Sequence, residues 1–248
     1  MPMDTLVVND ENALCLSLDW TSRTTNDARM AVSQSNGTLA LAPSIEKHVI
    51  ETWDAHGYET WICAWSRWND NVLWSGAYLL TGADDLTLRG WDTRTPLCDG
   101  TREPIFSVNR GFEGGVTAIE NNGHREHYWA VGSYDECLRI FDDRNPRRPV
   151  SETQVGGGIW RTKWHPTRPG TLLLGCMHDG FKVLECDSLA QGMDELNSPM
   201  TIVTRFDAHD SIAYGCDWER GTQGTEQASS LVYSCSFYDA ALHVWEWR

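Results

Sequence analysis

The sequence is poor in several features that mark other classes of protein. It has 35 acidic residues against 20 basic ones, of which only three are lysines, and its formal net charge is −15. Nucleic-acid binding depends on clustered Lys and Arg side chains that neutralise phosphates. The charge balance therefore argues against a nucleic-acid partner. It fits a cationic partner better, although an acidic surface also serves solubility alone.

Signals for membranes and export are also missing. No apolar run approaches the roughly 20 residues that a membrane-spanning helix needs, and residues 1–12 lack the basic and apolar stretches of a signal peptide. We therefore expect a soluble, cytoplasmic protein without a membrane partner. The eight cysteines include no C-x-x-C pair, so we expect reduced thiols and no structural zinc.

Motifs for nucleotide, metal or serine-hydrolase chemistry are absent as well. The sequence has no G-x-x-x-x-G-K-[ST] loop and no G-x-S-x-G turn. Residues 124–127 (HREH) do not match H-E-x-x-H, and we expect a polar loop before a strand. The glycine run 156–158 lacks the lysine of a phosphate loop, and we expect a tight loop that allows close backbone approach. We predict no cofactor and no metal site.

What the sequence does contain is an internal repeat. Five apolar, alternating stretches each end on a large residue, and each is followed by a polar turn and a second alternating strand. The large residues are Trp20, Trp65, Ile119, Trp164 and Trp218. The turn residues, which recur every 44 to 60 positions, are Asn36, Asp85, Asp135, Asp179 and Asp239. This period, with apolar residues at every second position, predicts units of several short antiparallel strands.

Two of the strands close with an aromatic residue followed by Asp, Trp91-Asp92 and Phe141-Asp142. This dipeptide gives WD repeats their name, and the sequence resembles a WD-repeat β-propeller over nearly its whole length. We predict an all-β single domain, residues 1–248, with five recognisable blades at 12–45, 54–97, 112–146, 156–187 and 208–248. Propellers close with about 4–8 blades, so we expect a seven-bladed protein of which this chain is an N-terminally shortened form.

One stretch of the second repeat is irregular. Residues 75–77 (SGA) and 81–83 (TGA) read as two copies of a strand end around the apolar Tyr78, Leu79 and Leu80. The pattern indicates either an insert from a rough gene sequence or a lengthened loop.

The densest group of reactive side chains is Cys176-Met177-His178-Asp179. Along a strand, Cys176 and His178 point to the same side, about 7 Å apart, which exceeds direct hydrogen-bond reach. In the alternative interpretation Asp179 is the ordinary turn residue, Cys176 packs in the core and His178 is a surface side chain. In a propeller, the residues just before the turn aspartates face one rim. In the other repeats these residues are Asp84, Tyr134 and Tyr238.

Three further aromatic residues, Trp61, Trp160 and Tyr214, lie four positions before the large residue of their repeat. From the start of an innermost strand they would reach a channel mouth beside Tyr134 and Tyr238. Aromatic faces with nearby carboxylates suit a quaternary ammonium ligand. Packing within the core is the alternative interpretation.

Several stretches are more specific than a generic propeller, and they occur in the same order in one family. They are residues 59–62 (ETWI), 88–94 (LRGWDTR), 124–127 (HREH), 132–136 (GSYDE), 164–166 (WHP), 176–178 (CMH) and 235–239 (CSFYD). Over residues 12–248 the sequence resembles the diphthine methylesterase family of WD-repeat proteins. Members of that family are longer at the N-terminus. They often carry a long insert before the last blade, where residues 219–230 are short here.

The resemblance implies hydrolysis of a carboxyl methyl ester on a modified histidine of elongation factor 2, a step of diphthamide biosynthesis that yields diphthine and methanol. That substrate carries a trimethylammonio group beside the ester, which suits the aromatic and acidic rim. We expect His178 to act as general base on water, while Tyr134 or Tyr238 donates a hydrogen bond to the oxyanion. Cys176 as a nucleophile is the less favoured variant. The expected substrate-binding residues are Trp61, Asp84, Trp160, Tyr214 and Tyr238.

A scaffold without chemistry is the alternative function. Arg94 and Arg144 each follow the Asp of the WD-type dipeptide by two residues. This is the W-D-x-R pattern of propellers that dock onto cullin-type ubiquitin ligases, and it also suits salt bridges at the blade ends. In this alternative the chain is a substrate receptor that contacts a ligase adaptor through Arg94 and Arg144.

Overall fold

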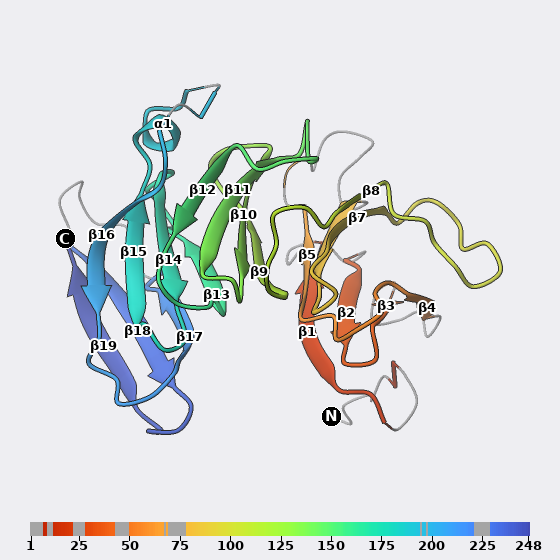
Figure 1. Ribbon diagram of the computed structural model, residues 1–248, viewed down its shortest axis with the longest axis horizontal. Helices are drawn as coiled ribbons and strands as arrows, with labels where there is room; N and C mark the ends of the chain where they lie inside the picture. The colour runs from red at the N-terminus through yellow and green to blue at the C-terminus, as the bar shows by residue number, and fades with distance from the viewer. Residues whose placement is uncertain are drawn as a thin grey trace. The chain divides into compact units, whose positions relative to one another are not determined.

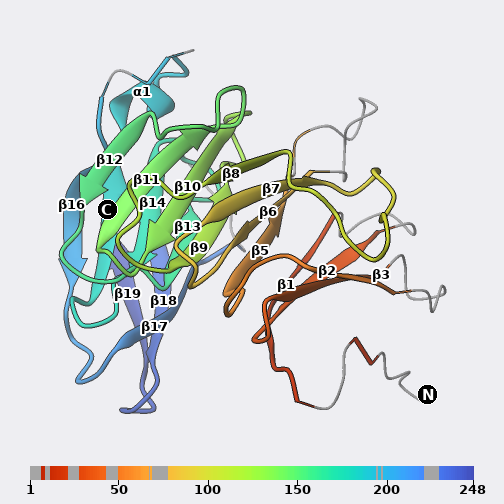
Figure 2. The ribbon, with the colours of Figure 1, turned by 45° about the vertical axis from the view of Figure 1, so that its right-hand side comes forward.

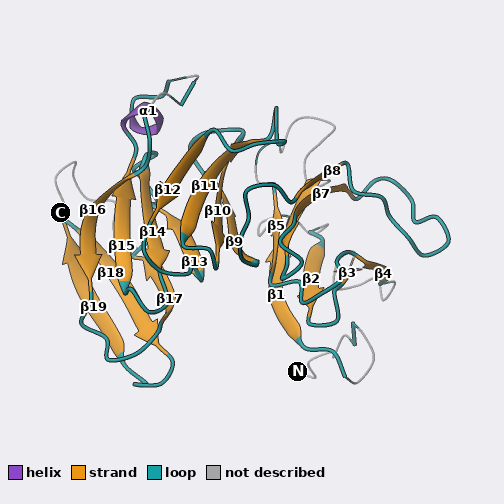
Figure 3. Cartoon of the chain, viewed as in Figure 1, coloured by secondary structure: helices purple, strands orange, loops and turns teal. Residues whose placement is uncertain are grey.

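The computed structural model describes residues 7–8, 12–21, 28–42, 50–66, 68, 78–193, 195–196, 198–220 and 229–248. Within these ranges nearly all regular structure is antiparallel β-strand, and the single helix is α1 (Asp187–Ala190), purple in Figure 3. The all-β prediction is confirmed. The chain divides into two compact units, Met1–Gly111 and Phe112–Arg248, which we describe one at a time.

The first unit contains two four-stranded sheets, each paired in chain order. One sheet is β1 (Cys15–Trp20), β2 (Met30–Gln34), β3 (Thr38–Ala42) and β4 (Glu51–Asp54). The other is β5 (Ile62–Trp65), β6 (Tyr78–Gly82), β7 (Leu88–Asp92) and β8 (Phe106–Val108). The two sheets lie side by side in Figures 1 and 2. A buried cluster that includes Leu39, Trp53, Trp65, Leu79 and Trp91 joins them.

The second unit contains three sheets. The first sheet is β9 (Val116–Asn121), β10 (Tyr128–Ser133), β11 (Cys137–Asp142) and β12 (Ser151–Gln154). The second is β13 (Arg161–Trp164), β14 (Thr171–Gly175), β15 (Phe181–Glu185) and β16 (Thr201–Phe206). The third is β17 (Ala213–Trp218), β18 (Ser230–Ser236) and β19 (Leu242–Trp247). One buried cluster joins the β9–β12 and β13–β16 sheets, and a second joins β13–β16 to β17–β19.

Each sheet takes its first three strands from one of the repeats found in the sequence. The fourth strand, where present among the described residues, follows the repeat: β4, β8, β12 or β16. In β12 and β16 exposed positions alternate with partly buried ones, and at least half of the residues of β4, β12 and β16 are polar. Because these strands have few apolar residues, they leave little hydrophobic periodicity in the sequence. The predicted repeats therefore end before the fourth strand.

The same kind of hydrogen bond, from an indole N–H to a backbone carbonyl, recurs between neighbouring sheets within each unit. The indole Nε1 of Trp65 donates to the carbonyl of Asp19 (3.2 Å), that of Trp164 to Glu120 (3.3 Å) and that of Trp218 to Lys163 (2.9 Å). In two cases the acceptor directly precedes the equivalent tryptophan of the neighbouring sheet. By the same rule Asn121, not Ile119, holds the tryptophan position in the β9–β12 sheet. The apolar alternation in the sequence stops at Ile119, whereas strand β9 runs two residues further, to Asn121.

The structure describes part of the irregular stretch in the second repeat. Tyr78–Gly82 is strand β6, which pairs with β5 and β7 in the middle of its sheet. Leu79 and Leu80 are buried, so these residues are an integral strand rather than an insert or a lengthened loop. Residues 75–77 lie outside the described part of the chain.

Candidate functional site

The turn between the second and third strands has the same backbone geometry in all five described sheets. The residue after the turn Asn or Asp has a positive φ in each: Gly37 (88°), Leu86 (60°), Glu136 (64°), Gly180 (69°) and Ala240 (53°). This conformation is uncommon for residues with a side chain. In three of the turns the Asp side chain accepts the backbone N–H two residues on, from Thr87, Cys137 and Ala241. Such bonds stabilise the turn and thereby fix the residue just before the Asp.

In the second unit the residues before two of these turn aspartates belong to one continuous row of aromatic rings. The ring centroid of Tyr134 lies 5.9 Å from that of Trp160, which lies 5.4 Å from Tyr214. The row continues with Phe237, 5.7 Å from Tyr214, and ends at Tyr238, 5.0 Å from Phe237. We call these five residues the aromatic row. All three sheets of the unit contribute to it, from the turns and strand starts at one end of each sheet.

Glycines allow the loop before Trp160 to pack tightly enough to place that ring. A Cβ atom on Gly157 would lie 2.3 Å from the carbonyl oxygen of Cys176, and one on Gly158 would lie 3.3 Å from the ring of Tyr134. Gly156 has a φ of +84°. The prediction of a tight glycine loop with close backbone approach is confirmed. The structure adds that the loop brings Trp160 between Tyr134 and Tyr214.

The aromatic row includes four residues that the sequence singled out for binding or catalysis, and one that it did not. Phe237 was not selected, although it lies in the family-specific stretch CSFYD directly before Tyr238. Its aromatic neighbour and its place at an exposed turn were the available signal. Exposure rises along the row: Tyr134 and Trp160 are half-buried, while Tyr214, Phe237 and Tyr238 are 40%, 64% and 74% exposed.

The first unit contains its own pair of the selected residues. The indole Nε1 of Trp61 donates a hydrogen bond to a carboxylate oxygen of Asp84 at 3.3 Å. Asp84 is exposed and precedes the turn residue Asp85. The edge of the indole ring and a carboxylate are thus in direct contact.

Cys176 and His178 do not share a side. Strand β14 ends at Gly175, and Met177 has a φ of +40°, so the alternation of an extended strand stops before these residues. Cys176 is completely buried in the core cluster, whereas His178 is exposed in the turn. The expectation of a common side was therefore wrong, and the alternative placement of Cys176 in the core is the one observed.

Burial also argues against Cys176 as a nucleophile. It raises the pKa of the Cys176 thiol to about 12, and the thiolate is the reactive form. His178, in contrast, is exposed in the turn. The carbonyl of Met177, the residue before it, accepts the N–H of Ala213, the residue before Tyr214.

The turn that carries His178 is held by charged groups. Asp179 is bound on one carboxylate oxygen by Lys182 and on the other by Arg205. Lys182 is fully buried and also donates to the carbonyl of Val155. A buried ammonium needs such partners, because an uncompensated charge in the interior is costly. The β14–β15 turn therefore rests on a cationic anchor that the sequence did not reveal.

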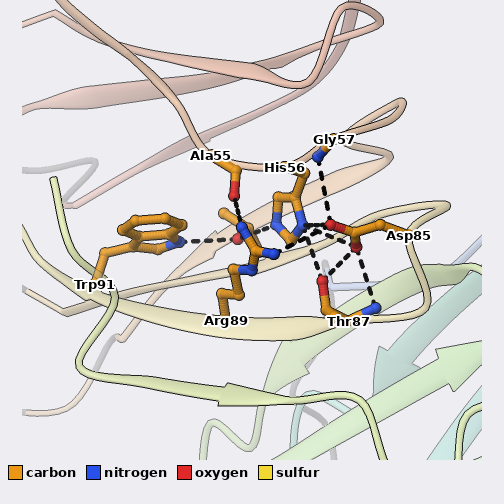
Figure 4. Close-up of polar contacts among 8 residues, drawn as sticks. Ala55, His56, Gly57, Asp85, Thr87, Arg89 and Trp91 are labelled. Carbon is orange, nitrogen blue, oxygen red and sulfur yellow. Dashed lines mark hydrogen bonds and ion pairs between the residues drawn. The ribbon is translucent and has the colours of Figure 1, made fainter. Parts of the chain in front are cut away.

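Two other turns rest on a histidine network instead. In the first unit, Trp91 Nε1 donates to Thr81 Oγ1 (2.9 Å), which contacts His56 Nε2 (2.7 Å), while His56 Nδ1 contacts Asp85 (3.0 Å; Figure 4). A neutral imidazole that accepts at Nε2 and donates from Nδ1 satisfies every group, and burial does lower the pKa of His56.

The carboxylate of that network is strongly stabilised. Burial alone would raise the pKa of Asp85, but hydrogen bonds from His56 and Thr87, with Arg89 nearby, outweigh it and lower the pKa to about 2. Figure 4 shows Arg89 bridging Asp85 and the carbonyl of Ala55. The groups are bonded in series, Trp91 to Thr81 to His56 to Asp85, and the first three are buried. We therefore interpret the network as a structural support.

The last sheet repeats the network with longer distances. Trp245 Nε1 donates to Ser234 Oγ (3.2 Å), Ser234 Oγ contacts His209 Nε2 (3.0 Å), and His209 Nδ1 contacts Asp239 (3.3 Å). Asp239 directly follows Tyr238. In the sequence the histidine of each network directly follows an alanine, at Ala55-His56 and Ala208-His209.

The arginines of the W-D-x-R pattern are both bound to the aspartate of their own dipeptide. Arg94 Nε lies 2.9 Å from Asp92, and Arg144 Nε lies 2.9 Å from Asp142. The hydrogen bond from Arg94 lowers the pKa of Asp92. The guanidinium groups stay partly exposed, with 38% and 52% of the two side chains accessible. Salt bridges at the blade ends, one of the two interpretations of the pattern, are therefore present.

The histidine-rich stretch 124–127 is a loop between β9 and β10, as predicted. His127 Nδ1 lies 2.6 Å from Asp143 Oδ1. Among the described residues no three His, Cys, Asp or Glu side chains are grouped in a way that could hold a metal ion. In the same part of the chain, no helix combines the length and the apolar character needed to cross a membrane.

Comparison with solved structures places this arrangement of sheets in a known class. The chain superposes with a TM-score of 0.62 on a chain in a structure titled "Crystal Structure of Mitotic Checkpoint Complex". The match covers 96% of this chain and 76% of the other, and the two sequences are 16% identical. That neighbour is a WD40-type β-propeller, and the present chain has the same fold.

Sequence comparison then gives the family, although no family model matches. The chain is 38% identical to "Diphthine methyltransferase" of Homo sapiens over 88% of its length and 46% of that protein. It is 33% identical to "Diphthine methyltransferase homolog" of Dictyostelium discoideum over 94% of its length and 62% of that protein. The chain spans about half the length of the human relative. It belongs to the diphthine methyltransferase family, which confirms the family that the sequence resembled.

Proposed function

We propose that this chain acts in diphthamide biosynthesis, where it hydrolyses the carboxyl methyl ester of methylated diphthine on elongation factor 2 to give diphthine and methanol. The relatives' names support a role in the methyl chemistry of diphthine. The observation that carries the proposal is the aromatic row, because the substrate presents a trimethylammonio group beside the ester. The cytoplasm, where translation factors act, is the proposed location.

The spacing of the aromatic row suits such a cation. A quaternary ammonium is attracted to a ring face within about 6 Å of the centroid, and neighbouring centroids from Tyr134 to Tyr214 are 5.9 and 5.4 Å apart. A cation beside two neighbouring rings can therefore lie within this distance of both centroids, and the guanidinium of Arg161 already lies 5.9 Å from the centroid of Trp160. The net charge of −15 favours a cationic substrate further.

The chemistry we propose needs only water and side chains. His178, exposed in the β14–β15 turn, takes a proton from the attacking water, and Tyr134 or Tyr238 donates a hydrogen bond to the oxygen on which negative charge develops. The tetrahedral intermediate then collapses with cleavage of the C–OCH3 bond, and protonated His178 gives its proton to the departing methoxide, which leaves as methanol. The carboxylic acid formed then ionises to the carboxylate. In the second unit we assign Trp160, Tyr214 and Tyr238 to substrate binding. Trp61 and Asp84 form an aromatic and acidic pair within the first unit.

The decisive experiment measures methanol released from methylated elongation factor 2 by the purified chain. We expect His178→Ala to lower kcat by about 10²–10⁴-fold, the usual contribution of a general base. His127→Ala, a half-exposed histidine at the opposite end of the β9–β12 sheet, is the matched control and should keep its activity. Full activity of His178→Ala would remove that residue as the base, and a wild-type chain that releases no methanol would end the proposal.

The relatives' name favours methyl transfer as a second candidate. A transferase would move a methyl group onto diphthine only when a methyl donor is added, whereas the esterase releases methanol without one. Incubation of the chain with elongation factor 2 that carries either diphthine or methylated diphthine, with and without a methyl donor, separates the two reactions.

A third candidate is the ligase receptor that docks through Arg94 and Arg144. Both arginines already bind an aspartate of their own chain, and their side chains remain partly accessible. Replacement of both by Ala should abolish capture of a cullin-ligase adaptor under this candidate, and should leave methanol release intact under the esterase proposal.

A further inference from the structure

The aromatic row is longer than a single trimethylammonio group requires. Two neighbouring rings can lie beside such a group, whereas the row extends through Phe237 to Tyr238. Phe237 is 64% exposed and projects from the β18–β19 turn. Large exposed aromatic side chains in a contiguous patch are typical of protein-binding surfaces.

Acidic residues lie close to this outer end of the row. Asp207 and Asp210 precede the strand that carries Tyr214, and Asp239 follows Tyr238. Arg205, which lies 3.9 Å from Asp207, is the basic residue paired with this group. Asp207 and Asp210 are exposed, and the backbone N–H of Asp210 donates to Asp239 in the turn that carries Phe237. An apolar anchor is thus flanked by carboxylates.

We propose that Phe237 and Asp210 form a docking surface for a basic segment of the protein substrate. The modified side chain then binds at the inner end of the row, where Tyr134 rather than Tyr238 is the oxyanion donor. The identity of that protein rests on the proposed function. Apolar burial of Phe237 supplies affinity, because a few aromatic residues dominate most protein interfaces. The carboxylates supply orientation and speed of association, because complementary charge acts chiefly on encounter.

The arrangement separates two properties of the enzyme. The docking surface sets the affinity for the polypeptide, and so KM for the whole protein substrate. The inner rings and His178 set the chemical step, and so kcat. Phe237 takes part in neither the cation contact nor the proton transfer, so its loss should leave kcat unchanged.

The test uses unmodified elongation factor 2 as the binding probe and methylated elongation factor 2 as the substrate. We expect Phe237→Ser to weaken binding of the unmodified protein about tenfold and to raise KM by a similar factor, with kcat within about twofold of wild type. Asp210→Lys should slow association at low salt and lose its effect at high salt. Leu242→Ser, 68% exposed in the same sheet but outside the row, and Glu103→Lys in the first unit are the matched controls.

Each outcome decides the inference. Equal effects of Phe237→Ser and Leu242→Ser, or no binding of unmodified elongation factor 2 by the wild type, would overturn the docking surface even if methanol is released. If Phe237→Ser weakens binding but the wild-type chain releases no methanol, the result would support the docking surface and reject the esterase proposal.

Discussion

The histidine networks below the β6–β7 and β18–β19 turns use the same kinds of side chain, but they differ in tightness. Each contact is about 0.3 Å shorter in the first, where Trp91 and Thr81 are completely or almost completely buried. Trp245 of the second network is only half-buried. Asp85 has Arg89 and Thr87 as further partners. The comparison indicates that the first network supports its turn rigidly, whereas the second supports a turn whose aromatic residues face solvent.

The largest expected effect is the loss of the indole of the tighter network. Trp91 also packs edge-on against Trp53, with centroids 5.8 Å apart. Trp91→Ala should lower the free energy of unfolding by about 3–5 kcal/mol, and Trp245→Ala, which loses less buried area, by about half of that. Chemical denaturation of both variants measures the difference. Tyr58→Ala, at an exposed site, is the control; equal losses for the two tryptophans would reject the comparison.

A smaller effect is expected from the hydroxyl at the centre of each network. Thr81→Val keeps the side-chain volume but leaves His56 Nε2 and the Trp91 indole N–H unpaired, at a cost of about 2 kcal/mol. Ser234→Ala should cost about 1 kcal/mol, because its bonds are longer and its tryptophan is nearer to water. Thermal melts under identical conditions give the ranking. A Ser234 variant that is the less stable of the two would contradict it.

The smallest effect concerns pH. The folded pKa of Asp85, about 2, lies below the ordinary value of 3.8, so its contribution is present above pH 3.8 and is lost as the pH falls towards 2. Between pH 4 and pH 3 this loss is about 1 kcal/mol. The lowered pKa of His56 acts in the same direction, because below pH 6.5 the unfolded chain takes up the proton more readily.

The measurement is the unfolding free energy between pH 7 and pH 3 for the wild type and Asp85→Asn. The variant should be less stable at neutral pH and its curve flatter below pH 4. A variant curve parallel to that of the wild type would show that Asp85 does not keep its charge in the folded chain.

Much of the candidate site followed from the repeat. Tyr134 and Tyr238 were selected because they precede a turn aspartate, and Trp160 and Tyr214 because they begin an inner strand. The structure brings all four into one row. Cys176 and His178 were misplaced relative to each other because a positive φ at Met177 ends the strand geometry, and no periodicity shows this. Asn121 was missed because a polar residue holds a position that is otherwise Trp.

The sequence alone determined the all-β fold, the five turns and the residues that each turn presents, because these depend on local alternation and on Asp or Asn at a fixed position. Only the tertiary structure decided that Phe237 completes the aromatic row, that Lys182 anchors one turn while histidines anchor two others, and that Cys176 is buried. These features depend on contacts between residues from different strands and sheets, often more than 20 positions apart, and chain packing alone sets such distances.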